Sequence, residues 1–364
     1  MRYSFNSDLL LSDADQEMAR KEYPDLSFAL DNALLRETFR PFDERANTAK
    51  TRSRRWGVFA VFLATGALLL AGGELLYHDL PKYQVRIIAG IGGVAGIVSV
   101  IIGVFGIMFR KRKMRWLADR LATERLRQYH FQYYVAHAEQ IVGAAQSEAA
   151  AEAFTLQRAR DFSEFQKGFL ETVDEELHHL VHTEDFGEGV LIEGGDAPVI
   201  DPEDKHWRAY LDAYVALRFN RQIGYCDYIL RERKSFWKQA PVQQEKILGA
   251  IAMGCVMGIL ILHGLVFVGA VANIGWMKGP LVHVFAIWAA IIALTARTFE
   301  EGFQPEREIE RMRQYRVSLK RIYARFEAAL APSEKIAAMR DLEKLSYEEM
   351  VLFLKSNYEA QFVM

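Results

Sequence analysis

Four long apolar runs dominate the hydrophobic pattern of the chain, and they fall into two closely spaced pairs. Because a bilayer core about 30 Å thick is crossed by about 20 apolar helical residues, the first three runs are long enough to span it. The fourth is shorter and is by itself also compatible with a buried core helix, but its pairing with the third across a brief turn favours a hairpin. The runs cover residues 56–73, 87–109, 247–274 and 281–296, and none contains Asp, Glu, Lys or Arg.

Outside these runs, large apolar side chains recur every three or four residues, which is the spacing of one face of an α-helix. Residues 110–160 contain no Pro and are rich in helix-forming residues, so a long helix is predicted to continue directly from the second run. We expect the apolar faces to pack on one another or on neighbouring subunits. The stripes consist of Phe162, Phe165, Phe169, Val173, Leu177 and Leu180; of Trp207, Tyr210, Tyr214 and Leu217; and of Met312, Tyr315, Leu319, Ile322, Phe326 and Leu330.

Glycine, proline and capping residues predict where the soluble helices break. Residues 182–203 are acidic and Gly-rich, which predicts a loop, with 190–192 and 199–200 as two short strands around a turn. Pro332 is predicted to end the helix that carries the third stripe. Ser346 and Glu349 have the spacing of a capping box, which predicts the start of a last short helix.

Together these elements predict an all-α membrane protein with four transmembrane helices, arranged as two hairpins, and a large helical cytoplasmic region. The N-terminus lacks the apolar core of a cleaved signal peptide, so the first run is expected to remain as an anchor. The expected divisions are cytoplasmic N-terminal helices at 1–55, a first hairpin at 56–109, a cytoplasmic helical domain at 110–246 with its loop at 182–203, a second hairpin at 247–296 and cytoplasmic C-terminal helices at 297–364.

The distribution of Lys and Arg predicts the orientation of the four runs. Basic residues are dense before the first run, after the second, before the third and after the fourth, whereas the two short turns hold only Lys82, Arg86 and Lys278. Because cytoplasmic loops carry the excess of basic residues, both termini and the middle region are expected to be cytoplasmic.

Composition and motifs exclude several classes of protein. The chain is 51% hydrophobic and 25% charged, with a formal net charge of −2, which is the profile of membrane helices joined to a charged soluble part. Its two cysteines, Cys226 and Cys255, do not make a disulfide framework. The sequence contains no P-loop, nucleophile elbow, kinase or dinucleotide motif, which argues against an enzyme, and no cofactor is expected. The lack of carboxylates within the runs argues against an ion-coupled transporter.

The segment after the second run carries a family resemblance. It reads RWLADRLATERLRQYHFQYY over residues 115–134, and it follows a basic lead-in and a two-helix unit. In this order of elements and in its Ala-x-Glu-x-Leu-Arg signature, the chain resembles the SLATT superfamily of bacterial membrane effectors. The resemblance covers residues 45–140 well and 230–330 loosely, and the second hairpin and the long middle region depart from the simple family pattern. It implies a pore-forming effector of anti-phage immunity in the bacterial inner membrane, responding to the product of a partner nucleotidyltransferase.

Two basic helix faces are candidate sites for such a nucleotide or oligonucleotide. Guanidinium groups bind phosphates, and tyrosine rings stack on bases. The alternative is that positive-inside bias and solvated charge pairs account for both faces. The first face offers Arg120, Arg125 and Arg127, and the second offers Arg311, Tyr315, Arg316, Lys320 and Arg321.

Glycines and one glutamate are candidates for helix packing or a pore wall. Gly92 with Gly96 and Gly254 with Gly258 form GxxxG motifs, which let helix backbones approach closely in lipid. Ordinary packing within one subunit is the alternative to an oligomeric pore. Glu74 follows the first run and would attract cations to a pore mouth, or simply end the helix. His178, His179, His182 and His206 lie near acidic residues but lack the spacing of a firm ligand set, so no metal is expected.

These features lead to two hypotheses for function. The first is an oligomeric channel or pore-forming effector gated from the cytoplasmic side by a nucleotide signal. A homo-oligomer, for which a tetramer is our expectation, is needed because four weakly polar helices enclose little room for a conduit. The second is a membrane-anchored scaffold that recruits a cytoplasmic partner protein through its amphipathic helices.

Overall fold

The computed structural model is built from helices and divides into two compact units. It describes residues 6–77, 80–183, 189–193, 199–232 and 240–360, without the side chains of 103–112 and Lys278, and these residues form no strand. What we call the helical unit consists of Met1–Thr48, Met114–Leu230 and Glu310–Glu359. The apolar unit consists of Ala49–Lys113, Arg231–Ile309 and Ala360–Met364.

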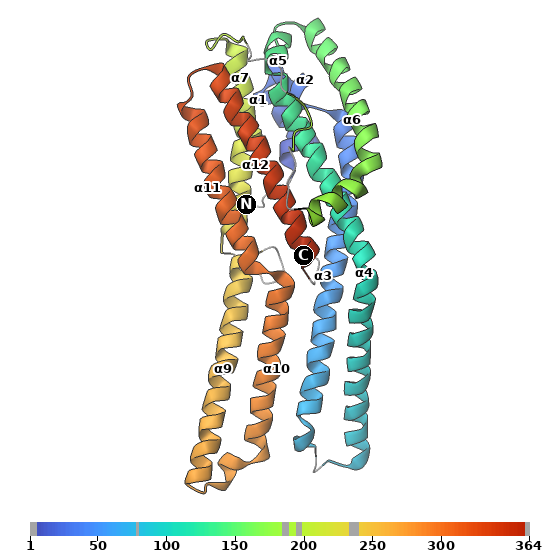
Figure 1. The fold of residues 1–364 in the computed structure, drawn as a ribbon, viewed down its shortest axis with the longest axis vertical. Helices are drawn as coiled ribbons and strands as arrows, with labels where there is room; N and C mark the ends of the chain where they lie inside the picture. The colour runs from blue at the N-terminus through green and yellow to red at the C-terminus, as the bar shows by residue number, and fades with distance from the viewer. Residues whose placement is uncertain (1–5, 78–79, 184–188, 194–198, 233–239, 361–364) are drawn as a thin grey trace. The chain divides into compact units, whose positions relative to one another are not determined.

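Figure 1 labels the helices in the order in which they occur along the chain. Short 3-10 helices are η1 (Ser7–Leu9), η2 (Pro24–Leu26), η3 (Glu74–Leu76) and η5 (Gly275–Lys278), and one π-helical turn is η4 (Val215–Phe219). The α-helices are α1 (Asp13–Glu22), α2 (Ser27–Leu30), α3 (Ala33–Gly72), α4 (Lys82–Ala136), α5 (Ala138–Ala144), α6 (Glu148–His182), α7 (Lys205–Tyr214), α8 (Asn220–Leu230), α9 (Pro241–Val271), α10 (Pro280–Phe303), α11 (Pro305–Ala328) and α12 (Pro332–Glu359).

Four helices, α3, α4, α9 and α10, are long and apolar enough to cross a membrane. This confirms that each of the four apolar runs belongs to a helix of membrane-spanning length. The fourth run, which is short in sequence, belongs to a helix of 24 residues because α10 begins at Pro280 and continues to Phe303. At about 1.5 Å rise per residue, that length is sufficient for a bilayer core of about 30 Å.

Polar side chains in the apolar unit bond to neighbouring helices. The indole Nε1 of Trp288 donates to the carbonyl of Leu69 at 2.9 Å, and the hydroxyls of Thr65 and Thr295 lie 2.8 Å apart, so α10 packs against α3. Ser99 of α4 donates to the carbonyl of Ala60 in α3 at 3.0 Å. In a membrane, where water does not satisfy such groups, these bonds favour helix association. Helices α9 and α10 lie side by side along their length (Figure 1).

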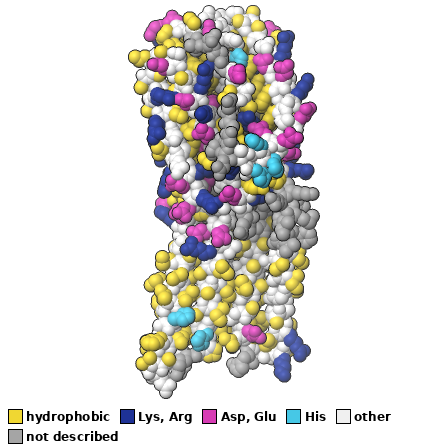
Figure 2. All heavy atoms as spheres, in the orientation of Figure 1, with side chains coloured by type: hydrophobic (Ala, Val, Ile, Leu, Met, Phe, Trp, Pro, Cys, Tyr) yellow, Lys and Arg dark blue, Asp and Glu magenta, His cyan; other side chains and the backbone are white. Residues whose placement is uncertain are grey.

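The outward surfaces of these helices are apolar. Ile91 and Ile97 of α4 are 58% and 61% exposed, and Leu260 and Phe267 of α9 are 61% and 70% exposed. Figure 2 shows one face of the apolar unit covered largely by hydrophobic side chains. Contact of so much apolar area with water costs about 25 cal/mol per Å², so this surface requires lipid or further protein around it.

The predicted amphipathic stripes form the core of the helical unit. Phe162 of α6, Tyr210 of α7 and Leu319 of α11 are completely buried, and they join one cluster with Leu126 of α4 and Leu342 of α12. The stripe on α11 ends earlier than predicted, because Leu330 lies beyond the helix and is 87% exposed. The apolar faces of these helices are therefore occupied within one chain.

The helix predicted to run through 110–160 is instead broken twice. Helix α4 ends at Ala136, the short α5 follows, and α6 begins after Ser147. The hydroxyl of Ser147 accepts the backbone N–H of Ala150, which satisfies a donor that the first turn of a helix leaves unpaired. Helix propensity alone predicted one continuous helix here. The Ser147 cap instead starts a new helix.

Two further expectations are wrong. Residues 190–192 and 199–200 form no strand in the described part of the chain, and residues 184–188 and 194–198 of the predicted loop lie outside it. Pro332 begins α12 rather than only ending the preceding helix, as suits proline in a first turn. Helix α12 then runs unbroken through Ser346, so Ser346 caps no helix. The Glu334 carboxylate instead accepts the N–H groups of Leu330 and Ala331.

Candidate anion-binding cavity

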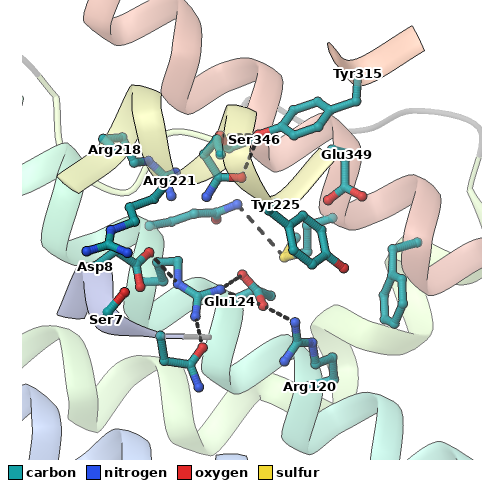
Figure 3. Close-up of a pocket in the computed structure, with 16 residues that line it drawn as sticks. Ser7, Asp8, Arg120, Glu124, Arg218, Arg221, Tyr225, Tyr315, Ser346 and Glu349 are labelled. Atoms are coloured by element: carbon teal, nitrogen blue, oxygen red, sulfur yellow. Dashed lines mark hydrogen bonds and ion pairs between the residues drawn. The ribbon is translucent and has the colours of Figure 1, made fainter. Parts of the chain in front are cut away.

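The helical unit contains a cavity of about 100 Å³ whose lining includes several charged side chains (Figure 3). A water molecule occupies about 30 Å³ of liquid, so the cavity has room for about three waters or one compact oxyanion. The lining consists of Asn6, Ser7 and Asp8 around η1; Arg120, Glu124, Arg127 and Gln128 of α4; Arg218 of η4; Arg221, Gln222 and Tyr225 of α8; Tyr315 of α11; and Ser346, Glu349, Met350 and Phe353 of α12.

Helix α4 supplies a row of alternating charges. Arg120, Glu124 and Arg127 are spaced by four and three residues, which places them on one helix face. Glu124 lies 2.6 Å from Nη2 of Arg120 and 2.7 Å from Nη1 of Arg127. Burial opposes ionisation of Glu124, but the two guanidinium groups outweigh it and lower the pKa of this carboxyl. Glu124 is therefore a carboxylate at neutral pH and holds both arginines in place.

Arg127 is the most heavily contacted cation of the cavity. Its Nη2 donates to the side-chain carbonyl of Asn6, and its Nε lies 3.1 Å from Oδ2 of Asp8. Burial disfavours the charge of Arg127, but Asp8 and Glu124 outweigh that cost and raise its pKa. Nevertheless, the buried Nε–H has no acceptor along its bond direction among the described residues. The Nε of Arg127 is therefore at ion-pair distance from Asp8 without a well-aligned hydrogen bond.

Arg218, which lines the cavity, forms a completely buried ion pair with Glu343. Nε and Nη2 of Arg218 donate to the two carboxylate oxygens of Glu343 at 2.9 and 2.6 Å, and the hydroxyl of Tyr214 adds a bond of 2.7 Å. The guanidinium group also lies 4.4 Å from the ring centre of Phe131. Such a two-bond arrangement fixes orientation as well as charge. Arg218 belongs to the π-helical turn, a distortion that is frequent near functional sites.

Helices α11 and α12 close the other side. The hydroxyl of Tyr315 donates to Oε1 of Gln222 at 3.1 Å and lies 3.2 Å from the hydroxyl of Ser346. Arg311 forms an ion pair with Glu349, which lines the cavity. The cavity therefore brings together residues of both basic faces that the sequence identified separately.

The lining contains four guanidinium groups and three carboxylates. Guanidinium donors with hydroxyls and amides around them suit the binding of an oxyanion such as a phosphate group. Among the described residues that line the cavity there is neither a histidine nor a cysteine.

The predicted ligand-binding residues divide into two groups. Arg120, Arg127 and Tyr315 line the cavity, and Arg311 acts on it through Glu349. The other four lie elsewhere: Arg125 pairs with Glu176 at 2.9 Å, Arg316 pairs with Asp227 at 2.8 Å, and Lys320 and Arg321 are exposed on α11.

Sequence reasoning did not identify Asp8, Arg218, Arg221 or Tyr225 as members of this site. A signal existed for Arg218, because it follows Tyr214 by four residues and so occupies the apolar stripe of its helix. A charged residue at such a position requires a buried partner. The sequence around Asp8 carries no comparable signal.

The candidate residues for helix packing or a pore wall differ in what surrounds them. A Cβ atom at Gly92 would lie 3.5 Å from Leu70, and one at Gly96 would lie 3.7 Å from Ala67, so this motif packs against α3 in the same chain. At Gly254 and Gly258 nothing lies within 4 Å of the corresponding position. Glu74 is exposed in η3, after the end of α3.

The His-rich segment makes ring contacts. The rings of His178 and His182 stack with centres 4.2 Å apart, and Nε2 of His182 lies 3.0 Å from the hydroxyl of Tyr358. His206 lies 3.6 Å from Asp25. Among the described residues, no group of three or more His, Cys, Asp or Glu side chains has an arrangement that would hold a metal ion.

Comparisons with protein-family models, with curated proteins and with solved structures found no match to this chain.

Proposed function

We propose that this protein is a homo-oligomeric membrane channel or pore-forming effector of bacterial anti-phage immunity, gated by a nucleotide or oligonucleotide. The observation that carries the proposal is the combination, in one chain, of four membrane-length apolar helices and a separate helical unit with an arginine-lined cavity. Helices α3 and α4 each contribute residues to both units, so a change around Arg120 or Arg127 acts directly on a helix that also belongs to the apolar unit.

The cavity is large enough to bind one part of a phosphate-bearing ligand. Its volume of about 100 Å³ fits one phosphate group rather than a whole nucleotide. The Arg120 side chain, which is 28% exposed, provides an entrance at which the rest of the ligand would lie. The half-buried rings of Tyr225 and Phe353 also line the cavity, Phe353 beside Arg120, and base stacking on aromatic rings contributes about 1–3 kcal/mol per base.

Orientation and location follow from the charge pattern and the family resemblance. With both termini and the helical unit on the cytoplasmic side of the bacterial inner membrane, the cavity faces the compartment in which a partner nucleotidyltransferase makes its product. A ligand shifts the gate only if it binds the open and closed states with different affinity.

The scaffold alternative has less support. It requires the amphipathic faces of the soluble helices to be available to another protein. Phe162, Leu319 and Leu342 of these faces are instead buried within the helical unit. A recruited partner would therefore have to use the polar surface or the few exposed apolar side chains such as Val317.

Ion flux through liposomes containing the purified full-length protein tests the proposal. We expect a panel of cyclic mono-, di- and trinucleotides to include at least one that changes the leak of a monovalent ion at least tenfold. Arg120→Gln, which removes a cavity cation, is expected to abolish the response. Arg316→Gln is the matched control because Arg316 pairs with a carboxylate away from the cavity. A flux that no ligand changes, or an equal loss in both variants, contradicts the proposal.

A further inference from the structure

The segment around η1 presents a carboxylate to the cavity from the N-terminal part of the chain. Asp8 lies 3.1 Å from Nε of Arg127, and the two side chains are only 7% and 10% exposed. We propose that Asp8 is a built-in competitor for a phosphate-group site centred on Arg127, so that the ligand binds by displacing Asp8 and loosening the η1 segment. This inference deepens the proposed function and rests on its ligand-binding part.

The contact between Asp8 and Arg127 is an ion pair without a well-aligned hydrogen bond at Nε. The carboxylate is at ion-pair distance from Nε but not in line with the N–H bond, and this donor has no other acceptor among the described residues. A phosphate group carries more oxygens and more charge than a carboxylate, and it fits the cavity of about 100 Å³.

The segment is also held in a conformation that favours its release. Asn6 has φ of 65° and Leu10 has φ of 52°, so both adopt the left-handed region. For a residue such as Leu this conformation is unfavourable, because the Cβ atom crowds the carbonyl oxygen that follows it. Burial of Leu9 and Leu10, together with the bonds of Asn6 to Asp43 and Arg127, offsets that cost. Displacing Asp8 removes one of the contacts that hold the strained segment.

Competition makes a prediction opposite to that for an ordinary ion pair. If Asp8 only stabilises the fold, Asp8→Asn weakens the protein and leaves phosphate binding unchanged or poorer. If Asp8 competes with the ligand, Asp8→Asn removes the competing charge and tightens binding. We expect the dissociation constant for inorganic pyrophosphate to fall at least tenfold in Asp8→Asn, measured by calorimetry on the full-length protein in a phosphate-free detergent.

Asp119→Asn is the matched control. Asp119 also pairs with an arginine, Arg45, at 2.7 Å, and its side chain is 9% exposed, but it does not line the cavity. We expect this variant to bind pyrophosphate like the wild type. An unchanged or weaker affinity in Asp8→Asn, or an equal gain in both variants, overturns the proposal.

Hydrogen exchange on the wild type provides a second readout that does not depend on the variant folding. Pyrophosphate is expected to slow amide exchange around residues 120–128 and to speed it in residues 6–11; slower exchange in both segments overturns the displacement. The same exchange measurement is repeated in detergent micelles with and without added phosphatidylglycerol. A stronger change with the lipid than with pyrophosphate identifies a headgroup as the source of the phosphate.

The outcomes separate this inference from the proposed function. Tighter pyrophosphate binding in Asp8→Asn without any ligand-dependent ion flux supports the competitor and contradicts the channel. Ligand-dependent flux with no effect of Asp8→Asn on binding supports the channel and contradicts the competitor.

Discussion

His130 links the stability of the helical unit to pH. Its imidazole is buried beside Phe131, and burial, reinforced by the charges of Arg158 and Arg218, lowers its pKa to about 3. The folded protein therefore keeps this ring neutral over a range in which the unfolded chain, with an ordinary pKa of 6.5, binds a proton. Stability from this residue is complete above about pH 6.5 and is lost as the pH falls towards 3, by about 1.4 kcal/mol per pH unit.

His130→Gln tests this dependence because it removes the titrating ring and leaves the carboxylates of the protein in place. The free energy of unfolding should fall less steeply for the variant than for the wild type between about pH 6 and about pH 4.5, by the slope of one proton. Chemical denaturation at several pH values measures both slopes. Parallel curves would show that His130 takes up its proton equally in the folded and unfolded states.

At the residue scale, the sequence indicated which side chains could bind an anion, but not which side chains pair with one another. It identified Arg120, Arg127 and Tyr315, because clustered guanidinium groups and tyrosines are visible in a helix pattern. It assigned Arg125 and Arg316 to the same role; in the structure these two pair with Glu176 and Asp227 and do not line the cavity. Partners such as Asp8 for Arg127 are separated by more than a hundred positions, and helical spacing carries no information about such contacts.

At the scale of helices, the two GxxxG motifs have different roles. The motif in α4 packs against α3, whereas the motif in α9 faces open space within one chain. Leucine at both Gly254 and Gly258 is therefore expected to lower the oligomeric mass in detergent while helix content and thermal stability stay within those of the wild type. Leucine at both Gly92 and Gly96 is expected to lower thermal stability instead, because it pushes against Ala67 and Leu70.

Light scattering coupled to size-exclusion chromatography measures the mass, and circular dichroism measures the melting. Leucine at Gly264, another open position on α9 outside the motif, serves as the control. An unchanged mass in the α9 double variant would exclude this face from the proposed oligomer.

The apolar runs predicted the membrane-length helices because a continuous apolar stretch of such a length is rare outside membrane spans. Local breaks were less predictable. The end of α4 at Ala136 and the unbroken course of α12 through Ser346 depend on caps and burial that compete with propensity. The short β segments were wrong because β-branched residues in a loop show a strand-like pattern without the partner strand that a ladder needs.

At the scale of the whole molecule, the proposed function requires the protein to cross a membrane with its helical unit on the cytoplasmic side. The chain is well suited to a cysteine-accessibility test. Of its two cysteines, Cys226 is completely buried, and burial raises the pKa of its thiol to about 12, which makes it unreactive. Replacing Cys226 and Cys255 by alanine gives a background for single reporter cysteines.

The most direct measurement is labelling of such reporters in intact bacterial cells with a maleimide that does not cross the inner membrane. Leu75→Cys, at an exposed position between α3 and α4, is expected to be labelled in intact cells. Ser163→Cys, at an exposed position of α6, is expected to be labelled only after the membrane is permeabilised. Labelling of Ser163→Cys in intact cells, or protection of Leu75→Cys there with labelling after permeabilisation, would contradict the proposed topology.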